Sequence, residues 1–405
     1  MVSFVYTAKN AQGQLISGVL EAPDANAVAK ALVEKQLYPV KIEQKKSGSS
    51  QKVTASFFDR ISTKQKAQTI RQFATLITAG LPVAKALSVL VKQLDKPYIK
   101  KIFANILKDI ENGESLSKAF SRFPSVFSVT EISLLQAGEA SGTLDGVLTR
   151  MARQLEKDYS LKSKIRSAMI YPSFVLVAVL GVIGVMFVYV IPKMQTLYDS
   201  FKGKLPAVTL LLMNISKFMV QYWWMILVGI IGTIVAIKAF ISTPGGRILW
   251  DKLKINIPGI GVLVKMVILA RFTRTLGTLM GSGVPVLDSL TISSNACGNV
   301  IYKERVLKVA EAVKGGKSLS EPLENDKYFP PVVCQMIGVG EQTGEMDKML
   351  EGLANYYEEE VDTLIKGLSA IIEPVIIVVL GLVVGGIMVA IMLPIYRLSD
   401  IMYKK

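Results

Sequence analysis

The chain carries one set of short motifs twice, about 203 residues apart. Residues 71–83 (RQFATLITAGLPV) recur as residues 274–286 (RTLGTLMGSGVPV). The segments NGESLS and GEASGTLD, at 112–117 and 138–145, recur as GGKSLS and GEQTGEMD, at 315–320 and 340–347. Each copy is followed by a long apolar stretch with a proline near either end. This pattern predicts a duplicated helical unit in which each copy is joined to its own membrane helix.

Composition supports a membrane protein and disfavours an enzyme. Of 405 residues 51% are hydrophobic, and they gather in a few runs. The chain has no histidine, which removes the usual general base and the commonest metal ligand. Its two cysteines, Cys297 and Cys334, form no CxxC motif and suit a reducing compartment. We therefore predict no catalytic residues, no cofactor and no metal site. Because no apolar h-region lies at the N-terminus, we expect no cleavable signal peptide.

Charge differs between the two copies. The net charge of the chain is +15, of which residues 1–168 carry +11, whereas residues 242–373 carry −2. A basic domain beside a bilayer favours contact with anionic headgroups or with an acidic partner surface. No motif that pairs aromatic with basic residues accompanies the charge, so we expect no nucleic acid partner.

The predicted fold is mostly α-helical, with a small N-terminal α/β unit, two homologous six-helix bundles and three transmembrane helices. Pro172 and Pro192 frame the first span and Pro374 and Pro394 the third, each pair 20 residues apart. Roughly 20 helical residues cover a hydrocarbon core of about 30 Å. The domains predicted along the chain are an α/β domain at 1–46, a linker at 47–55, a bundle at 56–168, a span at 170–192, a periplasmic loop at 193–221, a span at 222–241, a second bundle at 242–369, a span at 371–394 and a periplasmic tail at 395–405.

Helix signals lie at matching places in the two copies. Ser62 with Gln65 suits a capping box, and Ser115 can cap another helix. Gly80 and Gly283 suit left-handed helix ends, and Pro82 and Pro285 suit the first turns of the next helices.

Two pairs of charged residues recur with these signals. Arg71 and Arg274 lie one turn inside a helix, so each either forms a salt bridge within its bundle or faces a partner. Glu139 and Glu341 lie in the repeated Gly-Glu-x-Ser/Thr-Gly motif. Each either accepts hydrogen bonds from backbone amides at a tight helix junction or takes part in a partner or cation contact. The glycines of this motif are Gly138, Gly142, Gly340 and Gly344.

Two further motifs resemble nucleotide-binding loops, but the equivalent segment in the other copy lacks residues that such a loop needs. Gly316-Lys317-Ser318 resembles the end of a phosphate-binding loop, yet Glu311 stands where the full pattern needs glycine, and the first copy has no lysine. Residues 338–344 resemble a dinucleotide fingerprint with the wrong spacing, and the first copy lacks its first glycine. Turns between helices explain both motifs.

The third span and its approach carry unpaired polar signals. Glu373 lies at the mouth of this span, either at the membrane interface or in a contact that packs subunits. Gly381 and Gly385 have the spacing of a close helix contact, although chance explains them equally well. Glu358, Glu359, Glu360 and Asp362 lead into the span, either as a solvated face or in contact with a partner or a second copy.

The order of these motifs resembles that of type IV pilus inner-membrane platform proteins, within the type II secretion F family, over almost the whole chain. The motifs that carry the resemblance include GLP at 80–82, GEASG at 138–142, AMIYP at 168–172, VIPK at 190–193, LPAVT at 205–209, YYEEEVD at 356–362, Glu373-Pro374, GLVVGG at 381–386 and LPIY at 393–396. The resemblance implies a multi-pass bacterial inner-membrane protein with cytoplasmic bundles. It implies coupling of hexameric assembly and retraction ATPases to pilin subunits, contact with other pilus components, and homo-oligomers. Lys85 stands where relatives often carry a carboxylate, so no calcium site is expected.

Two alternatives are less favoured. A type II secretion platform would differ in cargo and neighbours. A small-solute transporter would have more spans and polar sites at the membrane midplane.

Overall fold

The structure, a computed structural model, describes residues 2–9, 15–22, 25–34, 37–44, 61–193, 207–324 and 326–403. The chain divides into two units, residues 1–60 and 61–405, and each is described by itself. The predicted linker at 47–55 and the Leu205-Pro206 motif lie outside the described residues.

The N-terminal unit is a three-stranded antiparallel sheet with one helix, as predicted. Its elements are β1 (Val2–Lys9), β2 (Leu15–Ala22), α1 (Ala25–Glu34) and β3 (Tyr38–Gln44), with the strand order β2-β1-β3. α1 buries Val28 and Leu32, one helical turn apart, and Ala8 of β1 is buried as well. The pairing of β1 with β3 shifts beside Pro39, which lacks the N–H of a regular ladder.

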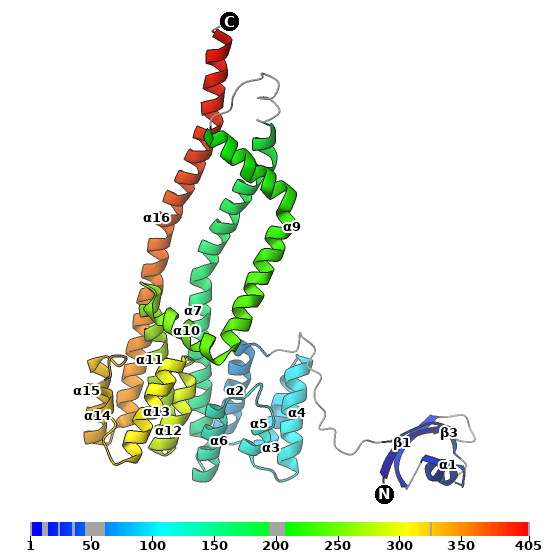
Figure 1. The fold of residues 1–405 in the computed structure, drawn as a ribbon. Helices are drawn as coiled ribbons and strands as arrows, with labels where there is room; N and C mark the ends of the chain where they lie inside the picture. Colours follow the sequence, from blue (N-terminus) through cyan, green and yellow to red (C-terminus); the bar gives the residue numbers. More distant parts are fainter. Residues whose placement is uncertain are drawn as a thin grey trace. The chain divides into compact units, whose positions relative to one another are not determined.

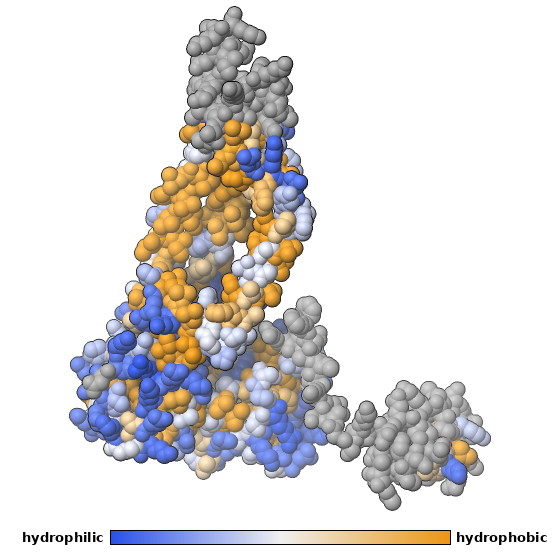
Figure 2. Space-filling view, in the orientation of Figure 1, coloured by the Kyte–Doolittle hydropathy of each residue, from blue (hydrophilic) through white to orange (hydrophobic). Residues whose placement is uncertain are grey.

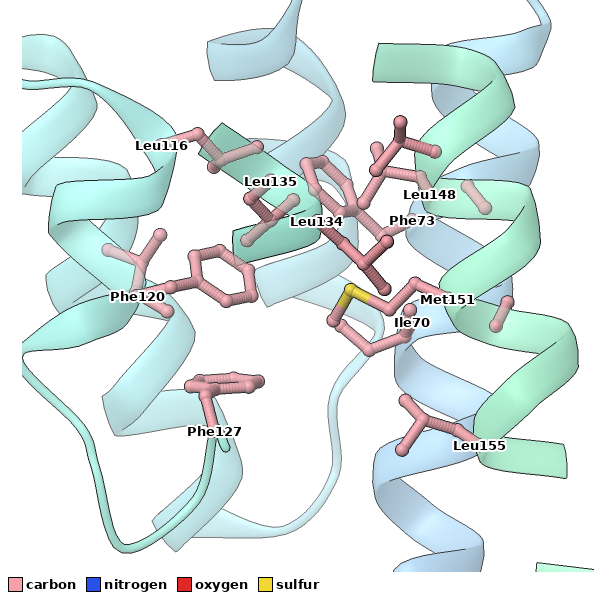
Figure 3. Packing of buried hydrophobic residues seen from close by; sticks show 14 of the residues in the cluster. Ile70, Phe73, Leu116, Phe120, Phe127, Leu134, Leu135, Leu148, Met151 and Leu155 are labelled. Atoms are coloured by element: carbon pink, nitrogen blue, oxygen red, sulfur yellow. The ribbon is translucent and has the colours of Figure 1, made fainter. Parts of the chain in front are cut away.

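The first bundle contains α2 (Thr63–Thr78), α3 (Val83–Gln93), α4 (Pro97–Glu111), α5 (Leu116–Ser121), α6 (Val129–Ser141) and the start of α7 (Leu144–Val185). Ser62 and Gln65 form the predicted capping box, and the Ser115 side chain caps α5. Figure 3 shows apolar side chains of these helices meeting in one core, with Phe73, Phe120 and Phe127 among them.

The second bundle repeats this order. Its helices are α11 (Ile260–Met280), α12 (Val286–Ala296), α13 (Val300–Lys314), α14 (Glu321–Glu324), α15 (Pro331–Thr343) and the start of α16 (Met346–Tyr403), preceded by α10 (Pro244–Asn256). The duplication read from the sequence is therefore a duplication of helices, in which α2 corresponds to α11 and α7 to α16.

Among the described residues, three helices are long and apolar enough to cross a membrane, or up to four if α10 and α11, bent by 108°, together form one span. The three lie in α7 with the segment up to Lys193, in α9 (Ala207–Ser242) and in α16. Figure 2 shows hydrophobic surface gathered on these long helices, whereas hydrophilic surface dominates the bundles.

Two features of these helices bear on the predicted domains, and the second differs from the loop predicted at 193–221. α7 continues through Pro172, and α16 through Pro374, so each bundle's last helix and its span form one helix. Residues 207–221, predicted as loop, are helical up to a break at Tyr222. Apolar packing accounts for this helix, because Met213 is buried against Phe187 and Ile191. The Ser216 hydroxyl also donates to the Phe187 carbonyl in the π-helical turn η1 (Met186–Val190).

Candidate functional site between the two helical bundles

The repeated arginines both form ion pairs with the last helix of their own bundle. Arg71 Nε lies 2.7 Å from Glu156 Oε1, and Arg274 Nη2 lies 2.8 Å from Glu358 Oε1. The hydrogen bond between the first pair raises the pKa of Arg71 and lowers that of Glu156. The two pairs differ in burial: 37% of the Arg71 side chain is exposed but only 9% of that of Arg274.

Glu139 and Glu341 each hold the start of a short helical segment. Glu139 accepts hydrogen bonds from the backbone N–H groups of Leu116 and Ser117 and from the Ser117 hydroxyl. Glu341 accepts the equivalent bonds from Leu319 and Ser320. Carboxylates suit these positions because the N–H groups that begin a helix have no partner within it.

The glycines of this motif serve two purposes. Gly142 and Gly344 end α6 and α15 in the left-handed region, at φ 70° and 73°. Gly138 and Gly340 let the next helix approach, since a Cβ would lie 3.0 Å from Val147 Cβ and from Met346 Cα respectively. The Gly-Glu-x-Ser/Thr-Gly motif thus folds alike in the two copies.

The remaining turn motifs also match. Gly80 and Gly283 have φ values of 84° and 81°. Pro82 and Pro285 occupy the N-cap positions of α3 and α12 rather than their first turns. In the motif that resembles a phosphate-binding loop, Lys317 pairs with Glu321 at 2.5 Å, and the Ser318 hydroxyl accepts from the Glu321 N–H at 3.2 Å. These bonds occupy both polar side chains of that motif.

Charged side chains of α7 and α16 join the bundles. Lys157 lies 2.8 Å from Glu358, Arg153 lies 3.4 Å from Glu351, and Lys164 pairs with Asp362. Partners are 198 or 201 residues apart, close to the repeat spacing, so α7 and α16 run parallel with equivalent levels side by side (Figure 1). The acidic approach to the third span was expected to be solvated or to contact another chain. That expectation was wrong for Glu358 and Asp362, which pair with the chain's own basic approach to the first span.

A cavity of about 500 Å³ lies between the bundles, beside these pairs. α7 contributes Asp158 and Lys162, α11 contributes Arg271 and α12 contributes Asn295. Burial raises the pKa of Asp158, although Arg271 and Lys162 oppose the shift. In the described part of the chain, no group of three or more His, Cys, Asp or Glu residues could hold a metal ion.

Three predicted residues lie on the third span, away from this interface. Glu373 is exposed on α16. No atom outside the local helix lies within 4 Å of a Cβ built on Gly381 or Gly385. No helix packs on that pair of glycines in the described chain. Their role in packing against a partner stays a prediction.

The sequence interpretation missed Glu156, Asp158 and the pairing between α7 and α16. Glu156 could have been found, because Glu358 occupies the equivalent position 202 residues later. The bundle contact had no such signal, since its partners lie in different copies.

The fold defines a class of membrane proteins built from a duplicated helical bundle with one span after each copy. Comparison with known proteins places the chain within that class. Residues 69–192 and 272–394 each match the family model "Type II secretion system (T2SS), protein F", and residues 1–43 match that of its N-terminal domain. The chain belongs to the type II secretion protein F family.

Individual relatives match almost the whole chain. It is 38% identical to type IV pilus assembly protein PilC of Myxococcus xanthus, over 98% of this chain and 95% of the relative. It is 34% identical to type IV pilus assembly protein TapC of Aeromonas hydrophila, over 98% and 96%. It is 33% identical to type II secretion system protein F of Vibrio cholerae, over 99% and 100%. These names describe assembly and secretion proteins rather than enzymes.

Proposed function

We propose that this chain is the inner-membrane platform of a type IV pilus machine and couples cytoplasmic assembly and retraction ATPases to pilin insertion and removal. The observation that carries the proposal is the continuity of α7 and α16 from each bundle into an apolar span. An unbroken helix transmits a displacement along its length, whereas a flexible linker absorbs it. The relatives named for type IV pilus assembly support the pilus as the machine served.

In this mechanism both bundles lie in the cytoplasm, where the ATPases contact them. The ion pairs of α7 with α16, among them Lys157 with Glu358, tie the bundles so that they move together. The movement reaches the spans, beside which pilin subunits enter and leave. The chain supplies force transmission and no chemical step.

A complementation experiment tests this function. Deleting the gene should abolish surface pili while pilin levels remain, and the wild-type chain should restore piliation. A chain with four glycines inserted after Ser167 in α7 should reach the membrane but fail to restore pili. The matched control carries the same insertion after Asp95, in the turn between α3 and α4, and should restore them. Normal piliation in the deletion strain would reject the assignment.

A type II secretion platform is the second candidate, because a relative of that name matches the chain at 33% identity. Loss of secreted enzymes from the medium, with pili intact, would favour it. Solute flux in proteoliposomes that contain this protein alone would instead indicate a transporter.

A further inference from the structure

The contact between the two bundles joins unlike surfaces. α7 of the first bundle packs against α16 and α11 of the second, and α6 packs against α11 and α12 (Figure 1). α6 and α7 correspond to α15 and α16, while α11 and α12 correspond to α2 and α3. The equivalent packing of α15 on α2 and α3 is not formed within the described chain. A contact of this type is heterologous, so each chain retains one free copy of each surface.

The free α2/α3 surface exposes what its counterpart buries. Thr275 of α11 is buried and accepts a hydrogen bond from Gln154 of α7 at 3.1 Å, whereas the equivalent Gln72 is exposed. Leu279 and Val284 belong to the same hydrophobic cluster as the core of the first bundle. Their equivalents, Leu76 and Leu81, are only half-buried.

The free α15/α16 surface is apolar at the matching places. Tyr356 is 49% exposed and Val339 is 47% exposed. Their equivalents, Gln154 and Ala137, are half-buried in the internal contact. Side chains that can cover a neighbouring bundle are therefore present and uncovered.

The free surfaces also carry opposite charges at positions whose equivalents line one cavity in the internal contact. Asp158 of α7 and Asn295 of α12 line the same cavity between the bundles. Their equivalents are Glu360 of α16 and Lys92 of α3, so repeating the contact brings Lys92 and Glu360 to the lining of one cavity. The repeat also brings Glu359 toward Glu156. Arg71, which pairs with Glu156 and is partly exposed, supplies the cation between those carboxylates.

We propose that copies of this chain associate head to tail, with the α2/α3 surface of one copy docked on the α15/α16 surface of the next, repeating the internal bundle contact. Because α7 and α16 run parallel, repeating the contact keeps the spans of successive copies parallel to one another. A heterologous contact of this kind forms a ring when its rotation closes. This inference holds whether the machine is a pilus or a secretion system.

Charge reversal in the full-length, detergent-purified protein tests the contact. Two differently tagged copies are co-expressed, and the fraction that co-purifies is measured. Lys92→Glu in both copies, or Glu360→Lys in both, should lower co-purification at least about fivefold, since like charges then meet. Co-expression of a tagged K92E copy with a differently tagged E360K copy should restore co-purification, because each contact between the two variants again joins opposite charges. The double variant K92E/E360K should co-purify with itself for the same reason.

Lys100→Glu is the matched control, because Lys100 is an exposed lysine of α4, a helix outside the repeated contact. It should co-purify like wild type. Co-purification at the wild-type level in both single variants would overturn the proposal and would indicate that copies associate through their membrane spans. A mixture of the two variants that does not regain co-purification, or a wild type that does not self-associate, would overturn it too. Each outcome is independent of whether the deletion strain lacks pili.

Discussion

At the scale of single residues, the same motif has different energetic weight in its two copies. Arg71 and Arg274 occupy equivalent positions and pair with equivalent glutamates. Arg274 also donates to Asn355 Oδ1 at 2.6 Å, and Lys157 of the first bundle contacts its glutamate partner. The internal contact thus turns a surface ion pair into a buried network.

Removing each arginine should separate these cases. Arg274→Ala should destabilise the second bundle by about 3 kcal/mol, because the buried carboxylate of Glu358 loses its main partner. Arg71→Ala should cost the first bundle about 0.5 kcal/mol, as expected of an exposed pair. Urea titration followed by brief proteolysis of the purified protein measures both. Equal losses would contradict the difference in burial.

Asp158 predicts a dependence of stability on pH. Burial raises its pKa in the folded protein above the ordinary value of 3.8. The folded state is therefore penalised as pH rises from that value through the raised pKa, and the penalty is complete above it. Asp158→Asn should raise the melting temperature at pH 7 and leave it unchanged below pH 3.8. An equal gain at both pH values would show that ionisation is not the cause.

At the scale of helices, the two copies differ in how closely the first and last helices approach. Gly277 of α11 faces α16, where a Cβ would lie 2.9 Å from Leu350 Cβ. The equivalent residue of α2 is Ala74, which is buried with its methyl group in place. α11 and α16 therefore pack more tightly than α2 and α7 at this level.

Gly277→Ala should consequently destabilise the second bundle by about 1–3 kcal/mol, because the added methyl overpacks this contact. Gly352→Ala is the same change on α16, where the nearest atom, Met336 Cε, would lie 3.8 Å away. It should be neutral or stabilise by up to about 1 kcal/mol through helix propensity. Denaturant unfolding measures the free energy of unfolding of each variant. Similar changes at both glycines would rule out overpacking as the cause.

The helices themselves were largely predictable from the sequence. The capping box at Ser62, the turns at Gly80 and Gly283 and the repeated Gly-Glu motif depend on residues close in the chain. Helix ends were less predictable, as the helix at residues 207–221, predicted as loop, shows. Pro172 and Pro374 do not end α7 and α16, because neighbouring helices and apolar surroundings can offset the cost of the freed carbonyl and the kink.

At the scale of the whole molecule, unequal charge joins the two copies. The basic side of α7 meets the acidic side of α16 at three levels, through the ion pairs of Arg153, Lys157 and Lys164. The sequence interpretation assigned the basic charge to contact with anionic headgroups or with an acidic partner surface. Part of it instead stabilises the contact of one bundle with the other.

Reversing one pair should measure this contribution. Lys164→Asp and Asp362→Lys should each weaken the bundle contact, and the double variant should recover about 0.5 kcal/mol of it. A double-mutant cycle on urea unfolding reports this coupling. It should fall in 1 M salt, where the Debye length is about 3 Å. A coupling near zero at low salt would contradict a role for this pair.

The sequence by itself determined the duplication, the turns and caps within each copy, and the apolar lengths that can span a membrane. These features depend on periodicity and on neighbours a few residues away, which are visible in a single chain. Only the tertiary structure decided which arginine is buried, which glutamates pair with which lysines, and which surfaces stay free. Those outcomes depend on how two bundles some 200 residues apart pack against each other, and equivalent residues reach different surroundings because that contact joins unlike faces.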